Sequence, residues 1–215
     1  MSSTKRGARR IEADYYPTPE SAFKPIIPFL PKDGQLWDPA WGDTRLVKWM
    51  LEAGLDADGT DLHDKEHPTD YLTDLTNRHC VITNPPFTQA FSFCQHAVAY
   101  SLHSFMLLRL GFLASQARRA WFQRHEPCAL FILSERPSFA ASVRCSRNAG
   151  LATQKKCHYQ VMIPAEQERP KKCPLCGSKV KVTTSDSADY AWVYWYQGQD
   201  RGSIRPPLYR GIYHV

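Results

Sequence analysis

The 215-residue chain lacks any apolar run close to the roughly 20 residues that a membrane-spanning helix needs. It also lacks internal repeats and long low-complexity tracts, so its organisation has to be read from local signals such as turn residues. The basic N-terminal stretch STKRGARR has no apolar segment behind it, and we therefore expect neither a secretory signal nor a membrane anchor. One α/β domain of ordinary size is the starting expectation.

Acidic residues are outnumbered by basic ones. The chain has 27 Lys and Arg residues against 21 Asp and Glu residues, a formal net charge of +6 and a pI near 8.9. This balance favours a polyanionic partner. Part of the excess lies in the segment 1–13, which we interpret either as a basic arm that touches phosphates or as a solvated tail.

The cysteine count argues against a secreted disulfide framework. Seven cysteines are an odd number, and no secretory signal accompanies them. The thiols are therefore expected to be buried, inert or metal-bound in a reducing compartment, with the cytoplasm as the expected location.

Short apolar strands alternate with helical patterns along most of the chain. Strands are predicted over 35–37, 58–62, 80–83, 104–113 and 128–135, with amphipathic helices between several of them. This alternation predicts an α/β fold with a doubly wound, mostly parallel sheet. The late aromatic run DYAWVYWYQG is predicted to be an antiparallel strand at or near the sheet edge.

The region 140–186 interrupts this rhythm, because it is polar and basic and holds four of the seven cysteines. We interpret it as an insertion into a catalytic domain formed by 14–139 and 187–215. Cys173 and Cys176 have the two-residue gap of a zinc knuckle. Cys145, Cys157 and His158 are the candidates for the two remaining ligands, and structural zinc is the favoured interpretation over unmetallated thiols.

The insertion is also the predicted nucleic-acid contact, because it leaves the carboxyl side of the predicted sheet and is rich in cations suited to neutralising phosphates. A solvated loop is the alternative. Its basic residues are Arg144, Arg147, Lys155, Lys156, Arg169, Lys171, Lys172, Lys179 and Lys181.

The strand 80–83 runs directly into the tetrapeptide Asn84, Pro85, Pro86 and Phe87. Two prolines cannot continue a strand ladder, so this segment must be a turn at the strand end. The amide oxygen of Asn84 and the carbonyl of Pro85 can accept the two N–H bonds of a planar amine, which directs its lone pair toward an electrophile. The ring of Phe87 can stack on a nucleobase that carries such an amine.

Another turn follows the first predicted strand at Asp38–Thr44, and an acid, Asp61, ends the second strand. Ligands of open α/β sheets bind outside the carboxyl ends of the strands, where a glycine such as Gly42 allows close approach and an acid can bind ribose hydroxyls.

Together, DYYPTP, DPAWGD, the acid after the second strand and NPPF resemble S-adenosylmethionine-dependent amino-methyltransferases, especially phage and bacterial DNA N6-adenine methyltransferases. ILSERPSF followed by DYAWVYW is similar to the phage-type branch. The chain departs from the usual family pattern at Trp41, which is bulkier than the common residue, and at Thr44, where a second glycine is usual.

The resemblance implies a Rossmann-like fold and S-adenosylmethionine as cofactor. It also implies roles for individual residues of this sequence. Asn84, Pro85, Pro86 and Phe87 would form the catalytic tetrad. The cofactor-binding residues would be Thr18, Pro19, Asp38, Pro39, Ala40, Gly42, Asp61 and Asp70, with Asp61 at the ribose and Asp70 at the adenine.

The predicted function is therefore methylation of the exocyclic N6 amine of adenine in duplex DNA, by base flipping and direct in-line attack. RNA is the less favoured nucleic acid. Alternatives are a methyltransferase for RNA adenine, cytosine N4 or protein glutamine, and a non-catalytic nucleic-acid-binding descendant of the fold.

Overall fold

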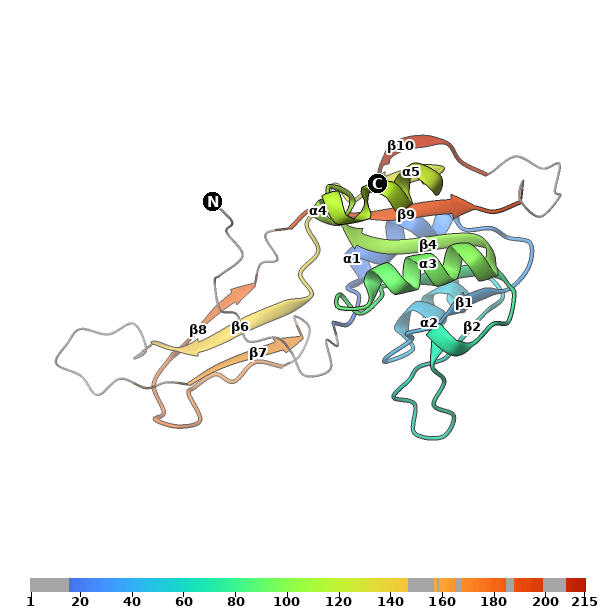
Figure 1. Ribbon diagram of the computed structural model, residues 1–215. Coiled ribbons are helices and arrows are strands. Elements are labelled where there is room, and N and C mark those ends of the chain that lie inside the picture. The colour runs from blue at the N-terminus through green and yellow to red at the C-terminus, as the bar shows by residue number, and fades with distance from the viewer. Residues whose placement is uncertain (1–15, 147–156, 158, 165–167, 185–187, 199–207) are drawn as a thin grey trace. The chain divides into compact units, whose positions relative to one another are not determined.

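The computed structural model describes residues 16–146, 157, 159–164, 168–184, 188–198 and 208–215 (Figure 1). The chain divides into two compact units, which are described separately. The larger unit comprises Glu20–Pro137 and Ser187–Val215, and the smaller unit comprises Met1–Pro19 and Ser138–Asp186. The predicted basic arm, 1–13, lies outside the described residues.

A seven-stranded mixed sheet forms the larger unit, with the order β10-β5-β9-β4-β3-β1-β2. Its strands are β1 (Leu36–Asp38), β2 (Ala57–Gly59), β3 (Arg78–Thr83), β4 (Ser101–Arg109), β5 (Ala129–Ile132), β9 (Tyr190–Tyr196) and β10 (Gly211–His214). Every pairing is parallel except those of β9, which runs antiparallel to both neighbours. The predicted doubly wound, mostly parallel sheet is confirmed.

The predicted edge position of the antiparallel strand is wrong. Strand β9 lies between β4 and β5, and the edge beyond β5 is formed by β10, which the sequence pattern did not reveal. Residues 190–195 are all buried, because the small residues between the aromatics are themselves apolar and both faces of the strand are covered. A strand that is apolar on both faces belongs in the middle of a sheet.

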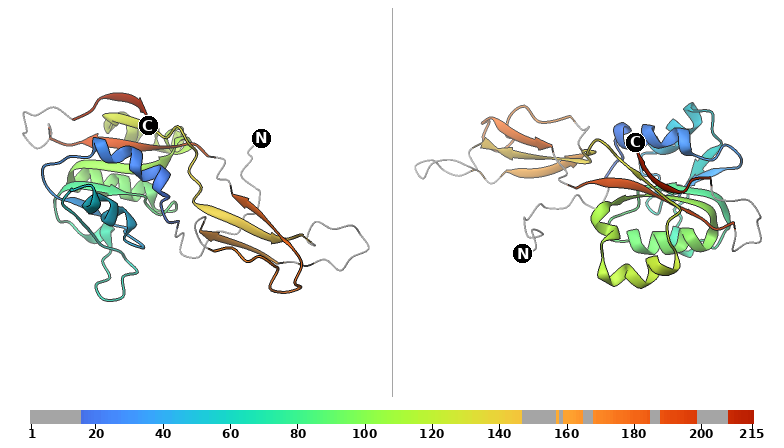
Figure 2. Two further views of the ribbon diagram at one scale, coloured as in Figure 1. Left: turned by 180° about the vertical axis from the view of Figure 1, so that it is seen from behind. Right: turned by 90° about the horizontal axis from the view of Figure 1, so that it is seen from above.

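Helices cover both faces of this sheet (Figures 1 and 2). One face packs against α1 and η2: the indole of Trp192 donates to the carbonyl of Ala22 at 2.8 Å, and the Phe29 and Phe131 rings are 4.8 Å apart. On the other face, α3 and α5 join a core that includes Val81, Met106 and Val193. The helices are α1 (Glu20–Phe23), η2 (Lys24–Phe29), α2 (Arg45–Glu52), η3 (Tyr71–Thr73), α3 (Ala90–Tyr100), α4 (Leu110–Leu113), η4 (Gln116–Arg118) and α5 (Arg119–Arg124).

The prediction that the apolar run 104–113 forms one strand is wrong. The last four residues of the run form α4, since β4 ends at Arg109. Hydrophobicity continues across this boundary, so the pattern alone could not distinguish strand from helix.

The smaller unit contains a three-stranded antiparallel sheet, ordered β7-β6-β8. Its strands are β6 (Ala140–Cys145), β7 (Gln160–Pro164) and β8 (Val180–Thr184). Val143 and Cys145 of the central strand are fully buried, whereas Arg144 between them is exposed, as the alternation of a half-buried strand requires. The predicted cysteine-containing insertion is therefore a small sheet of its own.

The longest described helix, α3, has 11 residues, and no described helix qualifies as a membrane-spanning segment.

Candidate active site

The sheet order changes direction at β1. This strand pairs in parallel with β2 on one side and with β3 on the other, and the chain reaches β2 through α2 before it returns to β3. The register Trp37↔Val81 brings the end of β1 beside the last residues of β3. Ligands of such sheets bind at this switch point, outside the carboxyl ends of the strands. The turns predicted to hold cofactor and substrate therefore start from adjacent strands.

Backbone hydrogen bonds join the turn after β1 to the end of β2. The amide of Thr60 donates to the carbonyl of Asp38 at 2.9 Å, and the amide of Trp41 donates to the carbonyl of Thr60 at 3.1 Å. A Cβ atom on Gly59 would lie 2.5 Å from the Asp38 carbonyl oxygen and 3.1 Å from the Trp41 ring. The bulky Trp41 is thus accommodated because residue 59 has no side chain.

The same turn contains two left-handed residues. Gly42 has φ 51° and is exposed, as expected for a turn that a ligand approaches closely. Thr44 has φ 64°, and among the described residues it is the single non-glycine residue with a positive φ. This conformation is rare for a β-branched residue. At residue 44 the turn therefore has a backbone conformation that glycine adopts more readily than threonine.

Asp61 connects the turns after β1 and β2. Its Oδ2 accepts a hydrogen bond from the Gly42 amide at 3.0 Å, and its Oδ1 accepts one from the His63 amide at 2.7 Å. Each carboxylate oxygen retains a further lone pair, so hydrogen bonds to ribose hydroxyls stay available to it. Asp70, farther along the same loop, is exposed and caps η3 by accepting from the Leu72 amide at 3.0 Å.

Asp38 is 1 % exposed and lies at the centre of this region. Burial raises the pKa of its carboxyl to about 7, and the nearby charges of Asp61 and Asp43 act in the same direction. The Thr83 hydroxyl and the Ala40 amide, which is 3.1 Å from Asp38 Oδ1, oppose this rise. Asp38 is therefore a buried acid whose charge is sensitive to a cation placed beside it.

The predicted tetrad lies at the end of β3, as expected. Pro85 is buried, Asn84, Pro86 and Phe87 are half-buried, and the Gln89 amide donates to the Pro86 carbonyl at 2.9 Å before α3 begins. The strand end and the helix start thus hold the tetrad from both sides.

Two residues beside Phe87 were not identified from the sequence. The guanidinium carbon of Arg109, at the end of β4, lies 4.5 Å from the centre of the Phe87 ring. Its Nε donates to the hydroxyl of buried Tyr190 at 2.8 Å, and the two residues are register partners in β4 and β9. The available signal was a charged residue that ends the apolar run SFMLL. The tetrad therefore has an oriented cation on one face of its aromatic ring.

Thr18 and Pro19 are buried in the segment grouped with the smaller unit, so the site of the larger unit is described without them. Their cofactor role stays a prediction.

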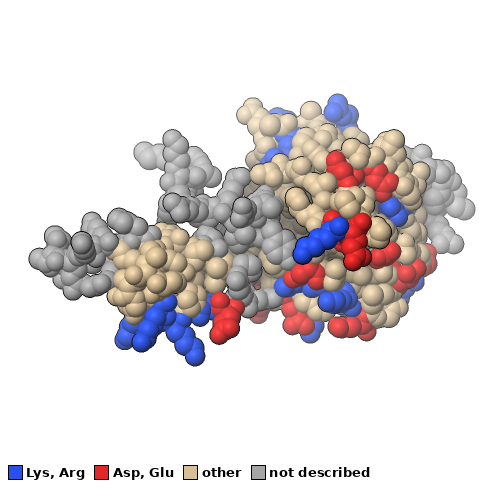
Figure 3. Space-filling model, turned by 90° about the horizontal axis from the view of Figure 1, so that it is seen from below, with Lys and Arg blue, Asp and Glu red and all other residues tan. Residues whose placement is uncertain are grey.

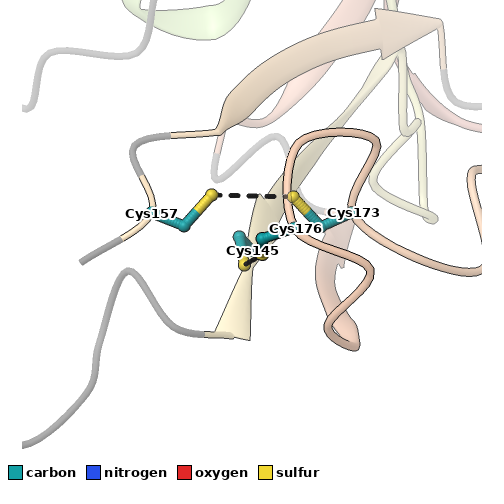
Figure 4. A group of neighbouring side chains, drawn as sticks. All are labelled: Cys145, Cys157, Cys173 and Cys176. Carbon is teal, nitrogen blue, oxygen red and sulfur yellow. Dashed lines mark hydrogen bonds between the residues drawn. The ribbon is translucent and has the colours of Figure 1, made fainter. Parts of the chain in front are cut away.

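Four cysteines form a cluster in the smaller unit (Figure 4). The Sγ atoms of Cys145, Cys157, Cys173 and Cys176 all lie within 4.8 Å of one another. Cys145 Sγ is 3.5 Å from Cys176 Sγ, and Cys157 Sγ is 3.6 Å from Cys173 Sγ. Tetrahedral zinc with Zn–S bonds of about 2.3 Å requires sulfur separations of roughly 3.8 Å. The cluster is compatible with zinc, and Cys157 completes it; His158 lies outside the described residues.

A tight turn presents the second pair of cysteines. The Cys173 amide donates to the Ser178 carbonyl at 2.8 Å, the Gly177 amide donates to the Cys173 carbonyl at 2.9 Å, and Gly177 has φ 69°. Hydrogen bonds from Ser178 lower the pKa of the Cys176 thiol to about 6. This favours the thiolate, which is the form that binds metal.

The predicted nucleic-acid contacts are partly described. Arg144, Lys171 and Lys172 are exposed, whereas Arg147, Lys155 and Lys156 lie outside the described residues.

A hollow of about 690 Å³ lies away from these sites, beside α5 and the start of β5, and Phe122, Pro127 and Leu130 contribute to its lining. None of the predicted site residues lines it.

Comparison with known proteins identifies the fold. No family model and no curated protein matches the chain. A crystal structure from Pyrococcus horikoshii, described as "a putative RNA methyltransferase", matches with a TM-score of 0.54 and 12% identity over 90% of this chain and 94% of that chain. A precorrin-6y C5,15-methyltransferase from Geobacter metallireducens has a TM-score of 0.38 and 10% identity over 87% of this chain and 100% of that chain. The chain thus has a Rossmann-like methyltransferase fold with a seven-stranded mixed sheet and a small antiparallel cysteine-rich insertion.

Proposed function

We propose that this chain is an S-adenosylmethionine-dependent methyltransferase that methylates the exocyclic N6 amine of adenine in DNA. One observation carries the proposal. On a methyltransferase fold, Asn84-Pro85-Pro86-Phe87 follows β3 directly beside the turn after β1, at the topological switch point of the sheet.

The residues around this switch point fit the cofactor. Exposed Gly42 permits close approach to the turn, the Asp61 carboxylate is suited to ribose hydroxyls, and buried Asp38 is suited to the side that carries an ammonium group. When bound, S-adenosylmethionine supplies an electrophilic methyl group on a sulfonium. Asp70 is the residue proposed to contact the cofactor adenine.

The tetrad supplies orientation for the transfer. The Asn84 side-chain oxygen and the Pro85 carbonyl each accept one N–H of the target amine, which directs its lone pair toward the methyl carbon. The lone pair would take the methyl group that the cofactor supplies, the sulfur would leave as a neutral thioether, and the extra proton on nitrogen would pass to water. Fixed dipoles stabilise the positive charge that grows on the amine.

The aromatic ring of the tetrad offsets the cost of base flipping. Removing a base from its stack costs a few kcal/mol, and base–aromatic contacts return roughly 1 to 3 kcal/mol. Arg109 lies against the Phe87 ring, so a flipped base and the guanidinium would meet at the same ring.

RNA is the second candidate substrate, and the description of the Pyrococcus horikoshii structure favours it. The two nucleic acids share the adenine amine, so the tetrad does not discriminate between them. Discrimination between RNA and DNA would require a contact to the ribose 2′-hydroxyl, which only RNA has.

The decisive experiment supplies labelled S-adenosylmethionine with unmethylated DNA and with RNA of the same sequence, and identifies the labelled nucleoside. Asn84→Ala should abolish transfer and leave cofactor affinity within about threefold, because its amide accepts from the target and not from the cofactor. Asn77→Ala, an exposed asparagine ahead of β3, is the matched control and should retain full activity. Absence of saturable cofactor binding to the native protein would favour the non-catalytic alternative.

We also propose that Cys145, Cys157, Cys173 and Cys176 hold one structural zinc ion. Four thiolates complete a tetrahedral shell and leave no open position, so the ion would stabilise the smaller unit and take no part in the transfer. Metal analysis and native mass spectrometry should find one zinc per chain, and loss of zinc on Cys173→Ser should confirm the ligand.

A further inference from the structure

Cations of the smaller unit occur in directly opposed pairs. Arg144 of β6 is the register partner of Lys181 of β8, and Lys172 pairs with Lys179 in an isolated antiparallel bridge. Side chains of directly opposed residues point to the same face of a sheet, where like charges destabilise each other. Two such pairs are an arrangement that a bound anion would relieve.

The two pairs are neighbours along the chain. Lys179 directly precedes β8 and Lys181 lies in it, and a two-residue spacing of roughly 7 Å keeps two side chains of an extended segment on one face. All four cations are exposed. We call this group, Arg144, Lys172, Lys179 and Lys181, the cation stripe.

Among the described residues of the smaller unit, cations outnumber acids. Its described residues include six cations and one acid, Glu168. Figure 3 shows Lys and Arg side chains gathered on one side of this unit, with the larger unit carrying interspersed charges of both signs. A stripe of one sign is the electrostatic footprint of a polyanion.

The cation stripe adjoins the cysteine cluster in sequence and through backbone hydrogen bonds. Arg144 directly precedes Cys145, and Lys172 directly precedes Cys173. The Ser146 amide, next to Cys145, donates to the Lys179 carbonyl at 2.9 Å, and the Cys173 amide donates to the Ser178 carbonyl at 2.8 Å. Each opposed pair therefore has one cation directly before a buried cysteine of the cluster.

We propose that the cation stripe binds the sugar-phosphate backbone of the substrate nucleic acid, and that a metal ion on the four cysteines is required to form it. The substrate class rests on the proposed function. Phosphate contacts of this kind position a nucleic acid without reading its sequence, so the stripe would give affinity and base recognition would stay with the tetrad.

The test measures binding of the full-length, metal-loaded protein to a fluorescent 24-base-pair DNA and to RNA of the same sequence, by anisotropy at several salt concentrations. The variant Arg144→Gln/Lys181→Gln should bind about tenfold more weakly, and its slope of log affinity against log salt should fall by roughly 1.8, about 0.9 for each lost phosphate contact to duplex DNA. Lys32→Gln/Arg124→Gln removes the same charge from exposed sites of the larger unit and should stay within twofold.

Metal removal by a chelator under reducing conditions is the second arm. Nucleic-acid affinity should fall at least as far as in the double variant, while affinity for S-adenosylmethionine stays unchanged. Equal binding by the two double variants would overturn the stripe, and undiminished binding after metal removal would overturn the metal requirement. Zinc content and thiol reactivity of each variant report whether the smaller unit is still folded.

Failure of this inference is distinguishable from failure of the proposed function. Stripe-dependent binding without methyl transfer would leave the inference standing and refute the activity. Transfer to a nucleic acid with no dependence on the stripe would do the reverse. A preference for RNA or for DNA in the binding measurements identifies which of the two nucleic acids the cation stripe binds.

Discussion

Thr44 holds a backbone conformation that glycine adopts more readily than a β-branched residue. It has φ 64° at the start of α2, where it makes no side-chain capping hydrogen bond. A left-handed conformation costs a residue with a Cβ atom roughly 1 to 2 kcal/mol, a cost that glycine avoids. Glycine also raises the conformational entropy of the unfolded chain, and this offsets part of that gain in stability. Strain of this kind persists where the surrounding structure holds the backbone, and it is frequent at functional sites.

Thr44→Gly should therefore raise the free energy of unfolding by about 0.5 to 1 kcal/mol. Urea denaturation monitored by tryptophan fluorescence provides the measurement. Lys48→Gly, at an exposed position within α2, is the control and should destabilise the protein by about 1 kcal/mol. A loss of stability in Thr44→Gly would contradict the interpretation of this turn.

Asp38 provides a pH-dependent test at the same scale. Its pKa is about 7 in the folded protein against 3.8 for the ordinary carboxyl, so the folded state holds a proton that the unfolded state releases. Stability should therefore fall as pH rises from about 4 to 7, by up to about 4 kcal/mol from this group.

Melting temperatures at pH 5.5 and pH 8.5 check this expectation. Asp38→Asn should lose the part of the pH dependence that comes from this carboxyl, and the variant should gain stability relative to the native chain at the higher pH. Saturating S-adenosylmethionine should reduce the dependence in the native chain, because an ammonium group would favour the carboxylate. If the melting temperatures of the two proteins change equally between pH 5.5 and pH 8.5, Asp38 is not the titrating group.

At the scale of elements, strands β3, β4 and β9 meet at one group of side chains. Phe87 follows β3, Arg109 ends β4 and Tyr190 begins β9, and the Arg109 guanidinium connects the other two. The antiparallel direction of β9 is what brings its first residue to the carboxyl ends of its neighbours. The position of β9 inside the sheet thus contributes to the candidate site as well as to the core.

Tyr190→Phe should release the Arg109 side chain, since it removes the hydroxyl that accepts from Nε. We expect the KM for nucleic acid to rise about tenfold with cofactor affinity unchanged, since hydrogen bonds to charged groups contribute about 1.5 to 3 kcal/mol. Tyr213→Phe removes a hydroxyl from edge strand β10 and is the control. A fall in kcat with unchanged KM would instead mean that Tyr190 orients the tetrad itself.

Sequence patterns predicted some of these elements better than others. The prolines after β3 and the apolar βα rhythm are local signals, and they predicted the end of β3 and the parallel strands. The place of β9 depends on pairing between segments about 80 residues apart, which alternation within one strand does not report. For the same reason Arg109 and Tyr190 were not recognised as neighbours of Phe87, whereas Cys173 and Cys176 were paired by their spacing alone.

At the scale of the whole molecule, each unit contains side chains that allow its state to be followed separately, by tryptophan fluorescence in one and by thiol reactivity in the other. All six tryptophans lie in the larger unit, and the four clustered cysteines lie in the smaller one. Removal of the proposed zinc ion should therefore make about four additional thiols reactive toward a thiol reagent, while the unfolding transition seen by tryptophan fluorescence stays unchanged. Cys80 and Cys94 are buried in the larger unit and should stay unreactive. Equal thiol reactivity before and after chelation would contradict a metal at the cluster.

The most direct test of the account is methyl transfer from labelled S-adenosylmethionine to unmethylated DNA and RNA, followed by nucleoside analysis of the product. The account predicts labelled N6-methyladenine with the native chain and none with Asn84→Ala, while both proteins bind the cofactor. Label on another nucleoside or on protein, or equal transfer by the Asn84→Ala variant, would contradict it.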